Sequence, residues 1–407
     1  MIKRIWYFGL VIVACNSGDG NREPLASGNW HAELEITNEV QLPFSFHLTL
    51  GDDTLISLRH ANEIIYLNNI RFTSDSFFIP VDPFDSEIKG TITPDGQMQG
   101  QWQDYSRGND YILRFHAWPD TIEKRNSNEA VFDAGGRWHT IFDKGKETEY
   151  NAIAQFTQAG NQITGTYLTE TGDYGVLIGE ADKDGFTVGR FDGGHAYLFK
   201  HQAETDSSFT GTYWSGIHSV ESIFAERDDR FTLRPPDSLT FLKEGYDRFS
   251  FAFPGLDGDT VRMTDKRFLN KVMIVQIMGT WCPNCLDESI FFAELYGRYR
   301  ERGLEIVALC FERTPELERS IKNVNRLRAR IPGLDYTFLI AGQSDKDAAS
   351  RALPMMSRVM AYPTALYIDR NGNVRKIHTA FSGPGTGEAY DNLRKETISL
   401  LEKLLDE

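Results

Sequence analysis

The stretch that decides the fold is a strand-like run ending in two cysteines: Val272-Met273-Ile274-Val275-Gln276-Ile277-Met278-Gly279-Thr280-Trp281-Cys282-Pro283-Asn284-Cys285. Its first seven residues are apolar except for one, which predicts a buried strand. A helical pattern follows over 286–302, and Pro283 suits the first turn because the N–H that proline lacks would have no helical partner there. The sequence therefore places both cysteines where a buried strand gives way to a helix.

The rest of the C-terminal region alternates in the same way. Strands are expected at 304–311, 336–340, 364–369 and 374–378, and helices at 316–330 and 387–405. Alternating strands and helices indicate an α/β fold. We predict one such domain over residues 239–407.

The region before residue 239 contains two pairs of similar short segments. Gly28-Asn29-Trp30-His31 returns 108 residues later as Gly136-Arg137-Trp138-His139, and Gly100-Gln101-Trp102 returns after 111 residues as Gly211-Thr212-Tyr213-Trp214. Nearly constant offsets suggest a duplication, with alternating apolar residues and Gly-containing turns inside each copy. We predict two all-β domains, antiparallel meanders or small barrels, over 28–119 and 133–228. The second resembles the up-and-down barrels of the avidin and lipocalin type, and the Trp-His pairs are expected to be structural.

The composition of the chain limits the classes of partner that it can bind. The chain has 407 residues, of which 43 are Lys or Arg and 58 are Asp or Glu, giving a formal charge of -15. The acidic residues outnumber the basic ones, and the sequence has no run of five or more basic residues, so nucleic acid is not expected as a partner. The length calls for two or three domains.

The N-terminus has the pattern of an export signal. Lys3 and Arg4 precede an apolar run over 5–14, which is too short to span a bilayer because a spanning helix needs about 20 residues. The run ends at Cys15, which resembles the site of a bacterial lipoprotein signal, where the cysteine becomes the lipidated first residue. We expect a signal peptide over 1–15, a tether over 16–27, and a protein anchored by lipid in a bacterial cell envelope, facing the periplasm. The alternative is an ordinary signal peptide with Cys15 incidental.

In an exported protein, a Cys-x-x-Cys at a strand-to-helix junction is typical of a redox dithiol. Cys282 would lie at the helix N-terminus, where unpaired backbone N–H groups favour a thiolate, so it is the expected nucleophile. Cys285, one turn deeper, is expected to resolve the mixed disulfide.

Three motifs in one order give the region from about Phe249 to Leu405 a resemblance to the thioredoxin superfamily, and within it to the membrane-anchored thiol-disulfide oxidoreductases of the TlpA and ResA type. They are Leu256-Asp257-Gly258, the segment 278–288 around the dithiol, and Ala361-Tyr362-Pro363-Thr364 leading into 366–372. The resemblance implies a redox disulfide between Cys282 and Cys285, and a cis-proline at Pro363. It also implies substrate contacts from Trp281, Tyr362 and Pro363, exchange with a membrane thiol protein, and no bound organic cofactor.

Glu288 follows Cys285 by three residues, so its carboxylate can lie near the dithiol on a helix. The resemblance implies that this acid deprotonates the cysteines, whereas Gln276, where thioredoxins hold a buried Asp, cannot exchange a proton. Two positions depart from the family: Ile290 replaces a common proline, and Asn270 a common glycine. The alternative for Glu288 is a solvated acid of the first helical turn.

The same residues argue against other functions. Zinc is not expected, because the C-terminal domain has no second cysteine pair and His378 is its only histidine. Cys310 is expected to be a core residue. A peroxidase of the peroxiredoxin kind would need a Pro-x-x-x-Thr-x-x-Cys loop, and Thr280 lies one residue too close to Cys282. The predicted function is thiol-disulfide exchange on protein or peptide disulfides, in the direction of a reductase. The alternatives are a partner-binding scaffold with an accessory redox domain and a peroxiredoxin-like peroxidase.

Overall fold

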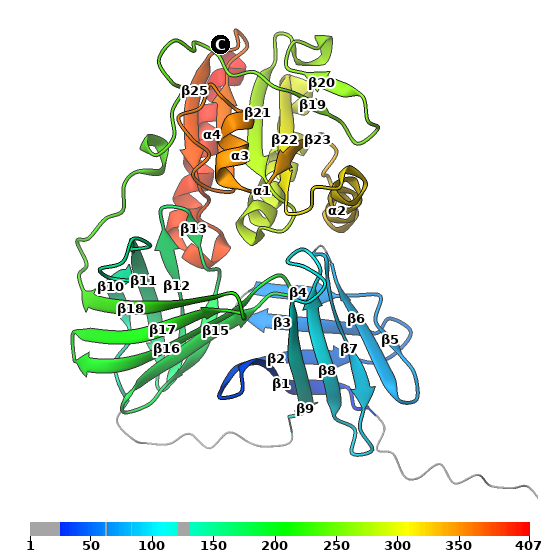
Figure 1. Cartoon of the computed structure of the whole chain (residues 1–407). Helices are drawn as coiled ribbons and strands as arrows, with labels where there is room; N and C mark the ends of the chain where they lie inside the picture. Colours follow the sequence, from blue (N-terminus) through cyan, green and yellow to red (C-terminus); the bar gives the residue numbers. More distant parts are fainter. Residues whose placement is uncertain (1–24, 62, 83, 121–130) are drawn as a thin grey trace, which may run out of the picture.

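The computed structural model describes residues 25–61, 63–82, 84–120 and 131–407. Cys15, the expected signal peptide and most of the expected tether lie outside these residues. Two β units lie side by side, and an α/β unit sits across both of them (Figure 1). None of the helices in the described ranges is long and apolar enough to cross a membrane.

The first unit is a curled, open sheet of nine antiparallel strands in the order β4-β3-β2-β1-β9-β8-β7-β6-β5. Its interior is filled by the apolar face of each strand, including the fully buried Trp30 and Trp102. The strands are β1 (Gly28–Thr37), β2 (Val40–Thr49), β3 (Leu55–His60), β4 (Glu63–Leu67), β5 (Arg71–Phe72), β6 (Ser76–Val81), β7 (Ser86–Ile92), β8 (Met98–Asp104) and β9 (Ile112–Pro119).

The second unit closes into a barrel. Its strands are β10 (Gly136–Phe142), β11 (Tyr150–Ala159), β12 (Gln162–Thr169), β13 (Gly172–Asp173), β14 (Leu177–Ala181), β15 (Gly185–Phe191), β16 (Ala196–Thr205), β17 (Ser208–Ser215) and β18 (Ser219–Arg227). Closure occurs because β11 pairs with β12 as well as with β10, while β13 is a short addition beside β12. The predicted all-β architecture is therefore confirmed, with one open and one closed form.

The repeated Gly-x-Trp-His segments have matching local structure. The indole N–H of Trp30 donates to the Ala26 carbonyl at 3.1 Å, and that of Trp138 donates to the Ala134 carbonyl at 2.9 Å. Both tryptophans are buried, as expected of structural residues. This match supports the duplication, which remains an interpretation of the sequence.

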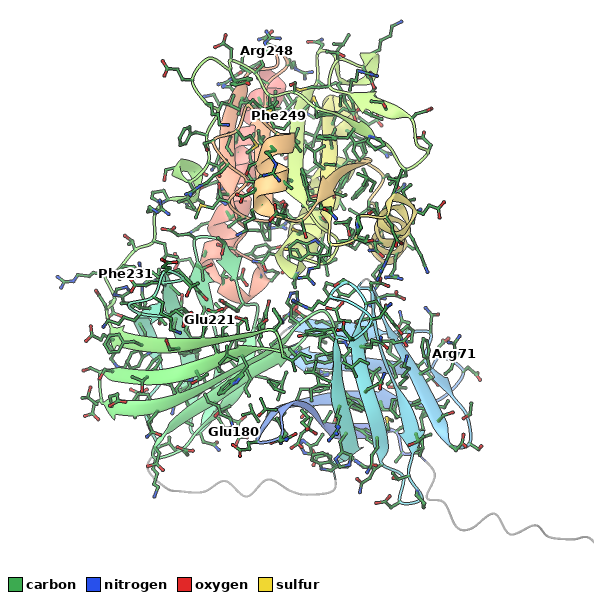
Figure 2. The ribbon with its side chains drawn as sticks, viewed as in Figure 1. Arg71, Glu180, Glu221, Phe231, Arg248 and Phe249 are labelled. Atoms are coloured by element: carbon green, nitrogen blue, oxygen red, sulfur yellow. The ribbon has the colours of Figure 1, made fainter. Side chains whose placement is uncertain are left out.

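The chain leaves the barrel through a segment that packs against it. Phe231 stacks on His139 with ring centroids 3.7 Å apart, and its carbonyl accepts a hydrogen bond from Arg137. Figure 2 shows Phe231 beside the barrel and Phe249 already inside the α/β unit. Pro235 and Pro236 lie in this crossing between the two units.

The α/β unit is built on a five-stranded sheet in the order β23-β22-β21-β24-β25. Strand β21 is parallel to β22 and antiparallel to β24, so it lies at the centre. The elements are β19 (Ala252–Pro254), β20 (Thr260–Arg262), β21 (Val272–Met278), α1 (Pro283–Tyr299), β22 (Leu304–Glu312), α2 (Leu317–Arg330), β23 (Thr337–Gln343), α3 (Lys346–Ala352), β24 (Thr364–Ile368), β25 (Val374–Thr379) and α4 (Glu388–Asp406).

The two departures from the family pattern have simple local outcomes. Helix α1 runs unbroken through Ile290, whose side chain is 49% exposed. Unlike proline, isoleucine keeps its backbone N–H and does not kink the helix. Asn270 adopts a φ of 59°, the left-handed conformation that explains why glycine is common there and why Asn can replace it.

Ion pairs join the open sheet to the α/β unit. The Asp85 carboxylate, from the β6–β7 connection, accepts from Arg319 and Arg326 of α2 at 2.9 Å each. Arg319 also donates to the Tyr105 carbonyl at 2.6 Å. These contacts bring the end of the sheet that carries β7 and β8 against the α/β unit.

Candidate active site

Cys282 caps helix α1. Its backbone is extended, and its sulfur accepts a hydrogen bond from the Cys285 amide at 3.4 Å. The Cys282 thiol donates to the Tyr362 carbonyl at 3.3 Å. Cys282 is 6% exposed, and both cysteines are free thiols, so the structure describes the reduced state of the pair.

Cys285 lies below its partner and is fully buried. Burial raises the pKa of its thiol well above the ordinary value, and the hydrogen bond and charge of Cys282 raise it further. Cys285 therefore stays protonated near neutral pH. Its use as a nucleophile requires a nearby group that takes the proton.

Glu288 is such a group by position. Its side chain is 1% exposed, and the Gln276 amide donates to Oε2 at 2.9 Å. Gln276 also donates to the Ser289 hydroxyl at 3.2 Å, so the amide ties the strand to the helix beside the dithiol. Burial raises the pKa of Glu288 to about 8, with the charge of Cys282 adding to the effect. The alternative of a solvated surface acid is wrong, because the carboxyl is buried.

The Tyr362–Pro363 peptide bond is cis, as the resemblance implies. The Tyr362 ring lies edge-on to the Trp281 ring, with centroids 5.5 Å apart. The Trp281 indole donates to the Phe311 carbonyl at 3.0 Å. A Cβ at Gly279 would lie 2.2 Å from the indole nitrogen, so only glycine admits this arrangement. The structure thus brings together all of the predicted site residues that it describes.

The residues expected to be inert lie elsewhere. Cys310 is fully buried near the C-terminal end of β22, and burial raises the pKa of its thiol well above the ordinary value. His378 faces Asp237, with Nδ1 2.7 Å from Oδ1. Within the described ranges, no group of three or more His, Cys, Asp or Glu residues could hold a metal ion.

Sequence reasoning missed two residues at the end of β22. Glu312 is 1% exposed and accepts hydrogen bonds from the Thr280 amide at 2.9 Å and hydroxyl at 2.7 Å, so it holds the segment just before the dithiol. Arg313 lies over the Trp281 ring, 4.3 Å from its centroid. They reach the site because β21 and β22 are parallel neighbours whose carboxyl ends meet at one edge of the sheet, a pairing that no local motif encodes.

The barrel also reaches the dithiol. The Asp173 carboxylate at the end of β13 accepts from the Gly383 amide at 2.7 Å and from the Asn284 side-chain amide at 3.3 Å. Asn284 lies between the two cysteines and also donates to the Phe381 carbonyl at 3.1 Å. A residue of the second β unit therefore contacts the Cys-x-x-Cys motif itself.

Comparison with known proteins agrees with this geometry. The Redoxin family model matches residues 247–393, which lie in the α/β unit. The thiol-disulfide oxidoreductase ResA of Geobacillus thermodenitrificans is 33% identical over 129 residues, covering 32% of this chain and 65% of that protein. ResA of Bacillus anthracis is 29% identical over 135 residues, covering 33% of this chain and 68% of its own length. The chain thus spans just under two thirds of the Geobacillus relative.

Solved structures also align with part of the chain. A thiol:disulfide interchange protein DsbE of Chlorobium tepidum, described as putative, is 24% identical and covers 37% of this chain and 95% of its own, with a TM-score of 0.29. A secreted thiol-disulfide isomerase of Corynebacterium glutamicum is 18% identical and covers 44% of this chain and 98% of its own, with a TM-score of 0.31.

The raised pKa of Glu288 predicts a pH-dependent stability. The folded protein keeps a proton up to about pH 8 that the unfolded chain releases near the ordinary value of 4.5. The stability associated with this proton is full below pH 4.5 and is lost as the pH rises through 8. In urea unfolding of the reduced protein, Glu288→Gln should therefore lose less stability than the wild type between pH 5 and pH 8. Equal losses in both proteins would contradict a buried carboxyl.

Proposed function

We propose that this protein is a thiol-disulfide oxidoreductase that reduces disulfides in proteins or peptides through Cys282 and Cys285. The observation that carries the proposal is the pair of free thiols at the start of α1 with a buried acid one turn below. The names of the ResA relatives, which are thiol-disulfide oxidoreductases, support the same reaction class.

In the first step, the Cys282 thiolate attacks one sulfur of the substrate disulfide. The Cys282–substrate bond forms as the substrate S–S bond breaks, and the other substrate sulfur leaves as a thiolate that takes a proton. Cys282 suits this role because it is the more exposed of the pair and the N-terminal backbone of α1 points at its sulfur. The Cys282 sulfur is oxidised and the leaving substrate sulfur is reduced, so the step needs no third redox partner.

In the second step, Cys285 resolves the mixed disulfide. Glu288 takes the Cys285 proton, the new thiolate attacks Cys282, and the substrate's second sulfur leaves as a thiolate that is then protonated. A carboxyl with a pKa of about 8 both accepts and returns a proton near neutral pH. The two electrons of the dithiol have then passed to the substrate, and a Cys282–Cys285 disulfide remains.

The substrate needs a place beside Cys282. The Cys282 thiol donates to the Tyr362 carbonyl, the Tyr362 ring contacts the ring of Trp281, and Pro363 follows Tyr362 in the chain. We assign Trp281, Tyr362 and Pro363 to substrate contact. A membrane protein carrying thiols would return the dithiol to its reduced state, and no bound organic cofactor takes part.

The first experiment tests the two cysteines. After mild reduction, iodoacetamide should modify Cys282 far faster than Cys285 or Cys310, since Cys282 alone combines access with a helix N-terminus. A Cys285→Ser variant should accumulate mixed disulfides through Cys282 when given an oxidised protein substrate, whereas a matched Cys310→Ser variant should turn over normally. Equal alkylation of all three thiols, or consumption of hydrogen peroxide without reduction of any disulfide, would reject the proposal.

The second experiment tests Glu288. Glu288→Gln keeps the size and hydrogen bonding of the side chain but removes the proton acceptor, so release of the reduced substrate should slow by about 10²-fold. The wild-type rate of this step should rise as the pH approaches 8, and the variant should lack that rise. Stopped-flow measurement of mixed-disulfide decay separates this step from the first attack. An unchanged decay rate would make Glu288 a structural residue.

The third experiment tests location. We propose that Cys15 is the lipidated first residue of the mature chain and that the protein faces the periplasm from a membrane. Wild-type protein should then sediment with membranes, and Cys15→Ser should be released or stay unprocessed, because the several acyl chains of a lipoprotein give stable attachment. Recovery of all wild-type protein in the soluble periplasmic fraction would reject the anchor.

A further inference from the structure

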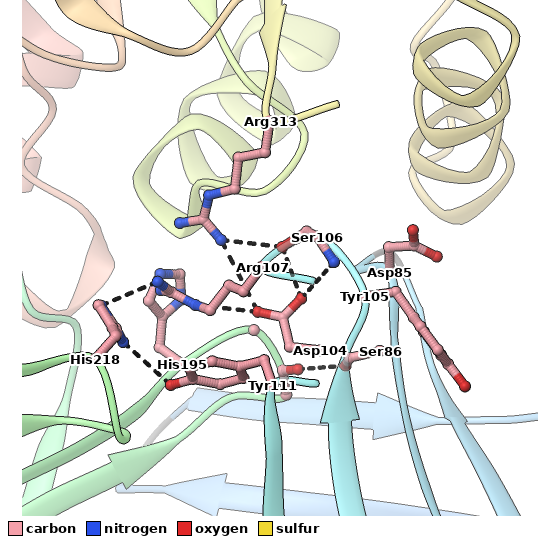
Figure 3. A network of polar contacts seen from close by, with 12 residues as sticks. Asp85, Ser86, Asp104, Tyr105, Ser106, Arg107, Tyr111, His195, His218 and Arg313 are labelled. Carbon is pink, nitrogen blue, oxygen red and sulfur yellow. Dashed lines mark hydrogen bonds and ion pairs between the residues drawn. The ribbon is translucent and has the colours of Figure 1, made fainter. Parts of the chain in front are cut away.

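A cluster of polar side chains lies where all three units meet (Figure 3), and one of its members, Arg313, lies over the ring of Trp281, the residue before Cys282. Arg313 enters it from the α/β unit, Asp104, Ser106 and Arg107 from the end of β8 in the open sheet, and His218 from the β17–β18 turn of the barrel. None of these residues has a part in the exchange reaction described above. Their arrangement nevertheless bears on Cys282.

Arg313 is held on two sides. Its guanidinium lies over the Trp281 ring, 4.3 Å from the centroid, which is a cation–π contact with the residue next to Cys282. On the other side it donates to the Ser106 hydroxyl at 3.0 Å and lies 3.9 Å from an Asp104 carboxylate oxygen. The side chain is 19% exposed, so its position is set by these contacts.

The cluster holds more positive than negative charge. The Asp104 carboxylate forms ion pairs with two guanidinium groups, since Arg107 Nε lies 3.1 Å from it and Arg313 is the second partner. Arg107 donates in turn to His218 Nε2 at 3.0 Å. Burial, together with the charge of Arg107, lowers the pKa of His218 to about 3, so this histidine is neutral and adds no charge. Among Arg313, Arg107, Asp104 and His218, two guanidinium groups therefore face one carboxylate.

The acidic side chains near this cluster have hydrogen-bond or ion-pair partners other than Arg313. Glu312, the next residue on β22, accepts from the Thr280 amide and hydroxyl, and Asp85 pairs with Arg319 and Arg326. Asp192 in the barrel pairs with Arg190, which also binds the Glu63 carboxylate. The other titratable groups around Cys282 are Cys285, Glu288, Tyr197, Lys346 and Tyr362, of which Lys346 alone is a cation.

We propose that Arg313 is a positioning residue of the dithiol: held over Trp281 by Asp104 and Ser106 of the open β-sheet, it supplies positive charge that favours the Cys282 thiolate. The inference rests on the proposed function and extends it, because it gives the first β unit a part in setting the reactivity of the α/β unit. Stabilising a thiolate also stabilises the reduced pair, so Arg313 makes the dithiol more oxidising than it would otherwise be.

The test measures the alkylation rate of Cys282 against pH in the full mature chain, with the reduction potential determined in glutathione buffers. In Arg313→Gln the pH of half-maximal alkylation should move upward and the rate at pH 6 should fall by about threefold to tenfold, as expected for removal of a nearby opposite charge. The potential should become more negative. Arg313→Lys should restore most of both properties, since it restores the charge.

Arg319→Gln is the matched control, because Arg319 joins the same two units through Asp85 and Tyr105 but does not contact Trp281. Its alkylation curve should match the wild type. An equal shift in this control would assign the effect to domain docking and overturn the inference, as would an Arg313→Gln curve that superimposes on the wild type. If Arg313→Gln fails to fold, Ser106→Ala should give a smaller shift in the same direction, and no shift would count against the inference.

The outcomes also separate the inference from the function on which it rests. If wild-type Cys282 reacts no faster than Cys285, the proposed function fails before Arg313 is considered. If Cys282 is selectively reactive and reduces disulfides, but its alkylation rate does not change in Arg313→Gln, only the proposed role of Arg313 fails.

Discussion

The hydrogen bond from the Cys285 amide to the Cys282 sulfur, at the first turn of α1, is the interaction on which the site depends. It requires β21 to end and α1 to begin within a few residues, which Gly279 and Pro283 allow. Once Cys282 caps the helix, Cys285 must point one turn inward and Glu288 another turn below it. The chemical asymmetry of the two thiols follows from that geometry, because one sulfur meets the helix N-terminus and the other is buried in the core.

The buried polar groups beneath the dithiol form a connected set. Gln276 replaces an ionisable residue in the centre of the sheet, and its amide binds the Glu288 carboxyl without exchanging a proton with it. A single buried acid costs less desolvation than two would, and its raised pKa is the consequence of that burial. Glu312 plays a different part, since its hydrogen bonds to Thr280 hold the segment that leads into Trp281 and Cys282.

The β units are part of the surroundings of this site. Asp173 of the barrel contacts Asn284 inside the Cys-x-x-Cys motif, and Ser106 of the open sheet contacts Arg313 beside Trp281. The two units derive from similar strand patterns, yet one closes and the other stays open, because β11 and β12 pair along their whole length while the first sheet ends at the short strands β4 and β5. Both present polar loop residues to the same face of the α/β unit.

The sequence by itself determined the α/β and all-β architecture and the strand-to-helix junction, because periodicity and short motifs are local properties of the chain. The resemblance carried by those motifs pointed to Cys282, Cys285, Glu288 and Pro363 as candidate site residues. The burial of Glu288 was decided only by the packing of α1 on β21, since spacing along a helix does not say which face is covered. Glu312, Arg313 and Asp173 could not be assigned for the same reason. Their partners lie 32, 207 and 111 residues away along the chain, and only the tertiary structure brings such residues together.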